Sequence, residues 1–276
     1  MALRIGDLDP THAGAAHALT TAVGWTHRLE DWVSALAVGR GLGAFDDDGT
    51  PRGALMWFPY GSAFATIGMV AVDPAVHRGG VGRALMDRAV ADAGGRSLIL
   101  VSTAAGRRLY ESLGFRVIGA NAAHVGVAAA TAPADGVEAG GAHDTPALVA
   151  LDAAAQGYPR EALVSALARD GEIAVVREDG VPIAFAICRL FGKGRQVGPV
   201  IARDEGQARL LIAWFLARHA GRTLRIDVPA DHPALAAWLV GLGFPRGGES
   251  PFMVRGDAPS PTGPARRYAL VSQAMC

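Results

Sequence analysis

The stretch VAVDPAVHRGGVGRALMDRAV, Val70–Val90, carries the strongest structural signal in this chain. It begins as an apolar strand, turns at Asp73-Pro74, and crosses a glycine-rich loop into a segment whose apolar residues share one helical face. A loop that opens a helix in this way presents several backbone N–H groups to one point, and the helix dipole adds positive potential. The stretch therefore predicts a strand–loop–helix unit that binds an anion such as a pyrophosphate.

The glycines of this loop support the anion-binding interpretation. A side chain at Gly80 or Gly82 would hold a phosphate away from the N–H groups. The loop lacks the Gly-Lys-Ser/Thr ending of a Walker loop and the G-x-G-x-x-G spacing of a dinucleotide fingerprint. A turn that merely joins strand to helix is the alternative interpretation.

Four sequence features recur in the same order at an offset of roughly 130 residues, which is the length of a domain rather than of a solenoid repeat. They are VSALA at 33–37 and 164–168, the turns DDDGTP and REDGVP, IGMVAVD at 67–73 opposite VGPVIARD at 197–204, and LYESLGF at 109–115 opposite WLVGLGF at 238–244. The repeats indicate a duplicated folding unit.

Each half predicts the same alternation of strands and helices, which is typical of an α/β domain with a mixed central sheet flanked by helices. The segment AAATAPADG, 128–136, is small, polar and interrupted by proline, so it is the predicted linker. We therefore expect two tandem domains, 1–127 and 137–276.

The composition excludes several classes of partner. Lysine plus arginine (26) balance aspartate plus glutamate (26), and no basic block suited to nucleic acid is present. The two cysteines form neither a disulfide framework nor a metal-ligand spacing. Because MALRIGDLDP lacks an apolar signal core and no apolar run approaches the roughly 20 residues of a membrane helix, we expect a cytoplasmic protein. Its oligomeric state, monomer or homodimer, stays open.

Two motifs together resemble the acetyl-CoA signature of the GNAT N-acetyltransferases. The family loop reads Gln/Arg-x-x-Gly-x-Gly/Ala; here His77 takes the first place, and Gly80 and Gly82 match. In the downstream pattern Asn-x-x-Ala-x-x-Leu-Tyr, Leu109 and Tyr110 match. The segments GWTHRLEDW, RIDVP and RYALVSQAM further resemble tandem two-domain GNAT proteins of the YitH type over essentially the whole chain.

Two residues depart from the family pattern. Thr103 stands for the Asn and Gly106 for the Ala of the downstream motif, which puts the usual Asn contact to the cofactor in doubt. The resemblance implies an N-acetyltransferase that uses acetyl-CoA as co-substrate, without a metal, and transfers acetyl to a primary amine of a small molecule. It implies that the amine attacks the thioester directly, so the site holds both reactants close.

The resemblance also assigns roles to residues. The expected acetyl-CoA contacts are Met69, Val70, Val72, His77, Arg78, Gly79, Gly80, Val81, Gly82, Arg83 and Thr103. Tyr110 is the expected acid that protonates the departing thiolate, with ring packing against the sheet as the alternative.

The general base and the acceptor pocket are less well defined by the sequence. The strand 64–72 contains no carboxylate, so Glu30, Asp31, His27 and His124 stay open as bases, each with a surface or helix-end role as the alternative. Candidate acceptor-binding residues are Trp25 and Trp32 between the first two helices, and Tyr158 and Asp227 in the second half. Helical spacing from Trp32 to Leu36 equally suits a core position, and Asp227 equally suits a turn near Pro229.

The second half lacks the chemistry of the first. Its loop is shorter, has no Gly-x-Gly, and places Asp204 and Glu205 where a pyrophosphate would lie. Leu239 replaces the tyrosine and cannot give a proton. We therefore expect one active site per chain, with two alternatives for the chain as a whole. These are a non-catalytic acyl-CoA sensor and a protein or peptide N-acetyltransferase, which would need an open acidic groove.

Overall fold

The computed structural model describes residues 3–76, 79–130 and 134–276, and the loop residues His77 and Arg78 lie outside them. In the first half the elements are, in chain order, β1 (Arg4–Leu8), α1 (Ala13–Ala22), α2 (Leu29–Val38), β2 (Arg40–Phe45), β3 (Pro51–Tyr60), β4 (Phe64–Val72), α3 (Val81–Ala93), β5 (Ser97–Val101), α4 (Arg107–Ser112) and β6 (Arg116–Val127). This order matches the prediction.

The second half repeats the order of the first. Its elements are β7 (Glu138–Ala139), α5 (Thr145–Gln156), α6 (Glu161–Asp170), β8 (Glu172–Glu178), β9 (Val181–Phe191), β10 (Gly194–Ala202), α7 (Glu205–Arg218), β11 (Thr223–Pro229), α8 (Pro233–Gly241) and β12 (Arg246–Arg255). One further strand without a counterpart, β13 (Arg266–Ala269), follows.

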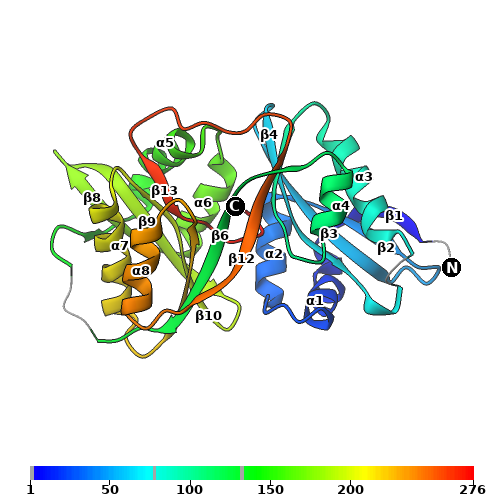
Figure 1. The fold of residues 1–276 in the computed structure, drawn as a ribbon, viewed down its shortest axis with the longest axis horizontal. Coiled ribbons are helices and arrows are strands. Elements are labelled where there is room, and N and C mark those ends of the chain that lie inside the picture. The colour runs from blue at the N-terminus through cyan, green and yellow to red at the C-terminus, as the bar shows by residue number, and fades with distance from the viewer. Residues whose placement is uncertain (1–2, 77–78, 131–133) are drawn as a thin grey trace.

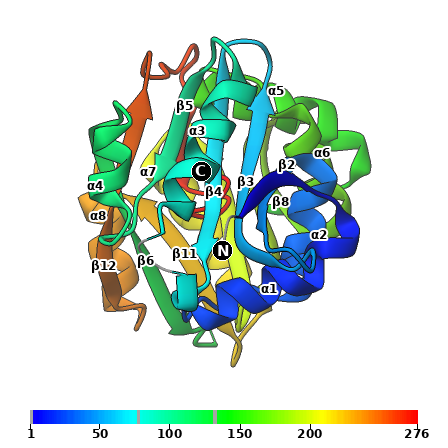
Figure 2. The same cartoon turned by 90° about the vertical axis from the view of Figure 1, so that its right-hand side faces the viewer.

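The described strands form one mixed sheet that runs through both halves (Figure 1). Its order is β1-β2-β3-β4-β5-β12-β6-β11-β10-β9-β8-β7, with β13 on β10. The pairs β4–β5 and β10–β11 are parallel, and the other pairs are antiparallel. Figure 2 shows α1, α2, α5 and α6 on one side of the sheet and α4 and α8 on the other. The predicted fold class, α/β with a mixed sheet flanked by helices, is confirmed.

The two halves exchange their last long strands. Strand β6 pairs with β11 of the second half, β12 pairs with β5 of the first half, and the two strands pair with each other. Figure 1 shows them crossing in the middle of the molecule. The predicted domain boundaries stay predictions, because the exchanged strands join both halves into one sheet.

The parallel strands at the centre of each half diverge. In the first half, β4 and β5 pair only from Phe64↔Ser97 to Ile67↔Leu100. In the second half, β10 and β11 pair only at Arg195↔Leu224 and Gln196↔Arg225, and β13 then takes the free edge of β10. The first gap contains a pocket, whereas the second is filled by the chain itself.

A single apolar cluster connects the halves. It contains residues of α1 and α2 such as Trp32, together with residues of α5 and α6 such as Leu163. Because this core is shared, the first two helices of each half support one another. No helix among the described residues has the length and apolar content to cross a membrane.

Candidate active site

The inner pocket lies in the gap where β4 and β5 diverge. Its volume is about 280 Å³, and five residues predicted for the site line it: Trp25, Met69, Val70, Thr103 and Tyr110. The second half contributes Phe191, Arg225, Gln273 and Ala274 to its wall. The pocket is thus built by both halves, although the predicted chemistry belongs to the first.

Strand β4 bulges where it borders this pocket. The pairing of β3 with β4 shifts register between Ala54 and Met56, and Met69 has a φ of 54°. A left-handed conformation is uncommon for a residue other than glycine and persists only where its surroundings enforce it. Next to it, a Cβ at Gly68 would collide with the carbonyl oxygen of Ala274. The bulge redirects the backbone of β4 into the pocket.

Tyr110 is held at the pocket by its own helix. The side chain lines the pocket, and the residue is 7% exposed. A Cβ at Gly106 would lie 2.7 Å from the tyrosine ring, so the ring packs directly on that glycine. The departure from the family alanine at this position therefore has a steric reason. Burial raises the pKa of Tyr110 to about 12, so its hydroxyl is protonated at neutral pH.

The N-terminus of α3 has the properties expected of an anion site. Gly80 is the N-cap residue, with a φ of 74° that favours glycine. Among the described residues no side chain caps this helix, and its first turn carries no acidic residue. The first N–H groups of the helix, from Val81 to Arg83, are thus left without an intrahelical partner. Gly79 precedes them, and Val72 ends the strand that leads to the loop.

The Thr103 side chain bonds to the turn that precedes α4, whose N-cap residue is Gly106. Its hydroxyl oxygen accepts a hydrogen bond of 3.2 Å from the backbone N–H of Gly106, at the start of α4. This bond fixes the helix that carries Tyr110. Thr103 also lines the inner pocket, so a cofactor contact from it stays a prediction.

His27 is the candidate base that lies at the inner pocket. Its ring is 5.7 Å from that of Trp25 and 5.5 Å from that of Phe191. Its Nδ1 is buried and has no hydrogen-bond partner among the described residues. Burial lowers the pKa of His27 to about 4, with the attraction of Asp31 opposing and the nearby Arg225 and Arg189 adding to the decrease. The imidazole is therefore neutral at physiological pH.

The other candidate bases lie elsewhere. Glu30 is exposed, with 70% of its side chain accessible. His124 is fully buried in β6, where its Nδ1 lies 3.1 Å from the carbonyl oxygen of Phe244. Asp31 is buried and already accepts three hydrogen bonds, so it has little capacity left for a substrate proton.

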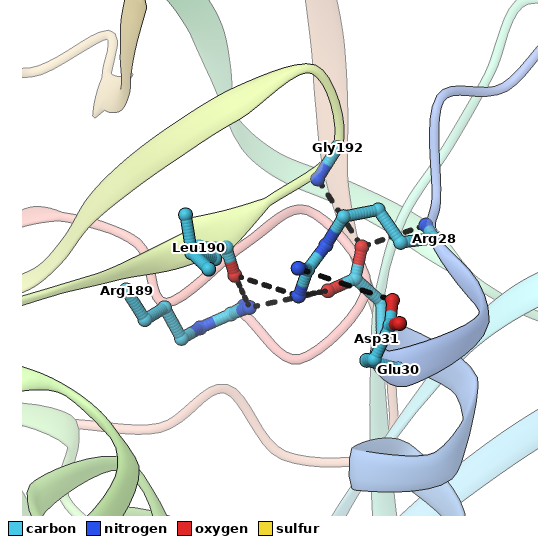
Figure 3. A network of polar contacts seen from close by, with 6 residues as sticks. All are labelled: Arg28, Glu30, Asp31, Arg189, Leu190 and Gly192. Carbon is cyan, nitrogen blue, oxygen red and sulfur yellow. Dashed lines mark hydrogen bonds and ion pairs between the residues drawn. The ribbon is translucent and has the colours of Figure 1, made fainter. Parts of the chain in front are cut away.

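Asp31 joins the two halves. Its carboxylate accepts hydrogen bonds from the backbone N–H of Arg28 (2.8 Å), from Arg28 Nη2 (2.9 Å) and from the N–H of Gly192 (3.2 Å). Arg28 also donates to the carbonyl of Leu190, at 3.2 Å (Figure 3). These contacts bind the β9–β10 hairpin of the second half to the start of α2. The hairpin thereby covers the pocket.

Three predicted acceptor residues lie away from the inner pocket. Trp32 is completely buried, and its Nε1 donates to Thr20 Oγ1 at 3.1 Å, so it is a core residue. Tyr158 is 3% exposed and stacks between Tyr60 and Phe64. Their burial leaves no surface for an acceptor, and we do not include either in the site proposed below.

Asp227 is also completely buried, but it forms a hydrogen bond with a residue that lines the inner pocket. Its Oδ1 accepts a 2.8 Å hydrogen bond from Arg225 Nε. Arg225 and Asp227 are two residues apart on β11, so they share a face of the strand. The sequence interpretation singled out the carboxylate and overlooked the arginine, although RIDVP contained this alternation. The resemblance of RYALVSQAM to tandem GNAT proteins included Gln273 and Ala274 without giving them a role, and no signal marked Phe191.

A second cavity continues outward from the first. Its volume is about 520 Å³, and it shares His27, Met69, Phe191 and Ala274 with the inner pocket. Charged residues of both signs line it, including Glu30, Asp31, Arg189 and Glu172. The two cavities are thus adjoining parts of one cleft between the halves.

Comparisons with known proteins identify the family of this chain. Two models described as "Acetyltransferase (GNAT) domain" match the chain, one at residues 38–117 and the other at 148–269. Together the matches cover most of the chain. It therefore belongs to the GNAT acetyltransferases, as a tandem protein with two GNAT domains, and is an N-acyltransferase by family.

Individual relatives match along most of the chain. The uncharacterized N-acetyltransferase YitH of Bacillus subtilis (strain 168) is 28% identical over 279 aligned residues, which cover 97% of this chain and 96% of YitH. A candidate acetyltransferase of Pyrococcus horikoshii has a TM-score of 0.83 at 17% identity, with 100% of this chain and 96% of that one covered. A tandem GNAT protein from the clavulanic acid biosynthesis pathway has a TM-score of 0.62 at 16% identity, with coverages of 91% and 98%. These two structures show the shared fold.

Proposed function

We propose that the first half transfers acetyl from acetyl-CoA to a primary amine of a small molecule, by direct attack of the amine on the thioester. One observation carries the proposal: Tyr110 and the Met69–Val70 bulge line a single pocket between diverging strands. The uncapped start of α3 follows the same strand in the chain. Acetyl transfer needs an acid for the thiolate, donors for the thioester carbonyl and a site for the pyrophosphate. Tyr110, the Met69–Val70 bulge and the start of α3 offer these in neighbouring parts of one half.

The residues present fit acetyl-CoA. The free N–H groups at the start of α3 would hold the pyrophosphate. Beyond Ile67 the edge of β4 that faces β5 has no strand partner, so its backbone groups would pair with the pantetheine arm. Bound acetyl-CoA supplies an activated acyl group to the pocket.

Each pocket residue then has a separate task. The backbone N–H groups at Met69 and Val70 would donate to the thioester carbonyl oxygen where negative charge develops. Tyr110, whose pKa is about 12, keeps its proton until the thiolate departs. His27 accepts a hydrogen bond from the amine through a neutral ring nitrogen, which orients the amine lone pair.

The low pKa of His27 has a consequence for the substrate. An imidazole with a pKa of about 4 does not remove a proton from an ammonium ion, because the amine nitrogen binds the proton far more tightly than the ring does. The amine therefore enters in its neutral form, or loses its proton to water in the outer cavity.

The covering of the pocket favours a small acceptor over a protein. The β9–β10 hairpin is bound to α2 through Asp31, and Gln273 and Ala274 form a further wall. A peptide chain would need an open groove, whereas these contacts enclose the inner pocket on the side of the second half. The outer cleft admits a small molecule without displacing them.

The rival function, a sensor that binds acyl-CoA without turnover, is favoured by one observation. None of the described residues that line the inner pocket is a carboxylate, so the pocket offers no strong base. Tyr110 speaks against it, because binding alone requires no acid there. Release of free thiol from acetyl-CoA in the presence of an amine panel separates the two: an enzyme releases thiol with an amine and a sensor does not.

Calorimetric titration with acetyl-CoA is the first test. We expect one site per chain, because the second half has neither the loop nor the gap. Two sites would contradict the assignment of the second half, and no binding at millimolar ligand would overturn the proposed function.

A further inference from the structure

The charge of the inner pocket does not match a simple amine. Among the residues that line it in the described part of the chain, Arg225 is the charged one, and no aspartate or glutamate joins it. A substrate with only a positive charge would meet a guanidinium and no counter-charge. The pocket is therefore suited to an acceptor that carries a negative group.

The Arg225 side chain is oriented by a buried hydrogen-bond partner. Asp227, which is completely buried, accepts a hydrogen bond from Arg225 Nε, and Gln196 Nε2 donates to the second carboxylate oxygen at 3.4 Å. The Arg225 side chain is 26% exposed. Among the described residues its two Nη nitrogens have no hydrogen-bond partner, so the end of the guanidinium is available to a ligand in the pocket.

A second arginine, which lines the outer cavity, adds positive potential near Phe191. Arg189 and Arg225 both lie over the ring of Phe191, at 4.7 and 5.9 Å from its centroid. Arg189 is mostly buried, and its Nε and Nη2 have no partner among the described residues. The nearest carboxylate oxygen, Asp31 Oδ1, is 3.9 Å from its Nη1 and already accepts a hydrogen bond from Arg28 Nη2. The charge of Arg189 is thus incompletely compensated.

The outer cavity gives no such preference. Apart from Arg189, its arginines are accompanied by carboxylates: Arg195 lies 3.1 Å from Glu172, and Arg28 lies 3.9 Å from Glu30 as well as close to Asp31. Around Phe191, at the junction of the two cavities, Arg189 has no close carboxylate, and Arg225 is paired with Asp227 only through Nε, which leaves its two Nη groups for a ligand.

We propose that the acceptor is a small amine that also carries a carboxylate, and that the two Nη groups of Arg225 bind this carboxylate while the amine faces Tyr110. The proposal deepens the proposed function and rests on it. The planar end of a guanidinium matches the two oxygens of a carboxylate in a bidentate pair. Arg225 is a specificity-determining residue, and Asp227 is the positioning residue that keeps its Nε side turned away from the ligand.

The test uses amines in matched pairs, each an amino acid and its carboxamide on the same carbon skeleton. Initial rates of thiol release from acetyl-CoA give kcat and KM for both members, and calorimetry measures the binding of both to protein saturated with CoA. We expect KM or Kd to be at least about tenfold lower for the carboxylate member of the preferred pair, which corresponds to about 1.4 kcal/mol.

Variants assign the preference to Arg225. Arg225→Gln should remove the difference between the paired compounds, and Arg225→Lys should keep part of it, because a lysine retains charge but not the fork. Asp227→Asn should raise KM for the carboxylate member while affecting the carboxamide less. Arg195→Gln, on the neighbouring strand and paired with Glu172, is the matched control and should leave the preference unchanged.

The outcomes distinguish failure of the carboxylate proposal from failure of the proposed acetyltransferase function. Turnover of amines with equal KM for carboxylate and carboxamide, or a preference that survives in Arg225→Gln, would overturn the carboxylate proposal alone. A stronger preference for phosphorylated amines over amino acids would replace the carboxylate by a phosphate and equally contradict it. Failure to bind acetyl-CoA would instead overturn the proposed function. Thermal unfolding of every variant shows whether a lost preference reflects lost folding.

Discussion

The starts of α3 and α7 hold corresponding places in the two halves, but they offer a ligand opposite surroundings. At α3 the N-cap is Gly80, and the N–H groups of the first turn are free among the described residues. At α7 the carboxylate of Asp204 accepts from the N–H of Gln207 at 2.9 Å, and the Gln207 side chain accepts from the N–H of Arg203 at 3.0 Å. The second helix start is occupied by its own side chains.

The same difference appears at the central bulge. Met69 of β4 corresponds to Pro199 of β10, and both strands shift register there. Proline has no N–H, so the second half cannot supply that donor to a carbonyl. Strand β13 pairs with β10 at Val200, Ile201 and Ala202, along the edge that β11 leaves after Gln196. The chain itself takes the position that a pantetheine arm would need.

The acceptor side is filled as well. In the first half the loop before α2 leaves a pocket at Trp25 and His27. In the second half the corresponding loop carries Tyr158, whose ring lies 5.5 Å from that of Tyr60 and 5.0 Å from that of Phe64. At the helix start, at the bulge and in this loop, the second half thus has internal contacts where the first half has a candidate site feature. The second half thus forms part of the wall of the inner pocket, and its own corresponding positions are filled by packed residues.

The largest expected effect concerns the tyrosine that only the first half has. Tyr110→Phe should lower kcat by about 100-fold or more, because general acid catalysis contributes 10²–10⁴-fold, while the Kd for acetyl-CoA stays unchanged. Steady-state kinetics and calorimetry on the same preparation check it. Leu239→Phe, at the corresponding position of the second half, is the control. A similar loss of kcat in both variants would show that packing, not proton donation, is responsible.

The two helix starts can be compared by one substitution. Gly82→Glu places a carboxylate at the start of α3 and should raise the Kd for acetyl-CoA at least about tenfold through repulsion of the phosphates. The nearest atoms to a Cβ there are 3.6 and 3.7 Å away, so the helix accommodates the change. Gly206→Glu makes the same change at α7 and should leave the Kd unaltered. An effect of Gly206→Glu would mean that the second half also binds the cofactor.

A smaller effect is expected at the contact between the halves. Asp31→Asn weakens the bonds to Arg28 and Gly192 and should lower the free energy of unfolding by about 1–2 kcal/mol, with a rise in KM for the amine. Asp144→Asn is a suitable control, because Asp144 also accepts from a backbone N–H and an arginine but lies away from both cavities. It should lower stability without changing KM. Equal KM changes in both variants would contradict the covering role of the hairpin.

The smallest effect is a pH dependence. His27 has a folded-state pKa of about 4, below the unfolded value of about 6.5, so the unfolded chain binds the proton more tightly. Its contribution to stability is full above pH 6.5 and is lost as pH falls toward 4. At pH 6, wild type should lose about 1 kcal/mol relative to pH 8 that His27→Gln does not lose. Denaturant unfolding at both pH values measures this, with the exposed His143→Gln as control; a loss retained in His27→Gln would refute it.

The duplication and the order of elements followed from the sequence because hydrophobic periodicity and turn residues are local signals. LYESLGF and WLVGLGF each end a helix in the same way, and the glycine-rich loop announces the start of α3. The strand exchange did not follow, because β6 and β12 have the same pattern whichever sheet edge they pair with. Register within a strand is local, but the choice of partner is not.

The pocket was predictable only on the side of the first half. Trp25, Met69, Val70 and Tyr110 were identified because a family motif or a loop position marked them. Phe191, Arg225 and Gln273 reach the pocket through the exchanged sheet and the segment after β13, which no spacing reveals. Trp32 and Tyr158 show the converse: an aromatic residue near a predicted site is often there for the core.

The exchange of β6 and β12 also constrains how the protein can be made. As the chain leaves the ribosome, β5 has no neighbour on its far side until residues 246–255 have been synthesised. The first half, which holds all of the proposed acetyl-CoA site, is thus left with an open hydrogen-bonding edge for most of translation. Such an edge is a template for unwanted pairing with other chains. The half that holds the proposed site therefore depends on the other half as a late partner that closes its sheet.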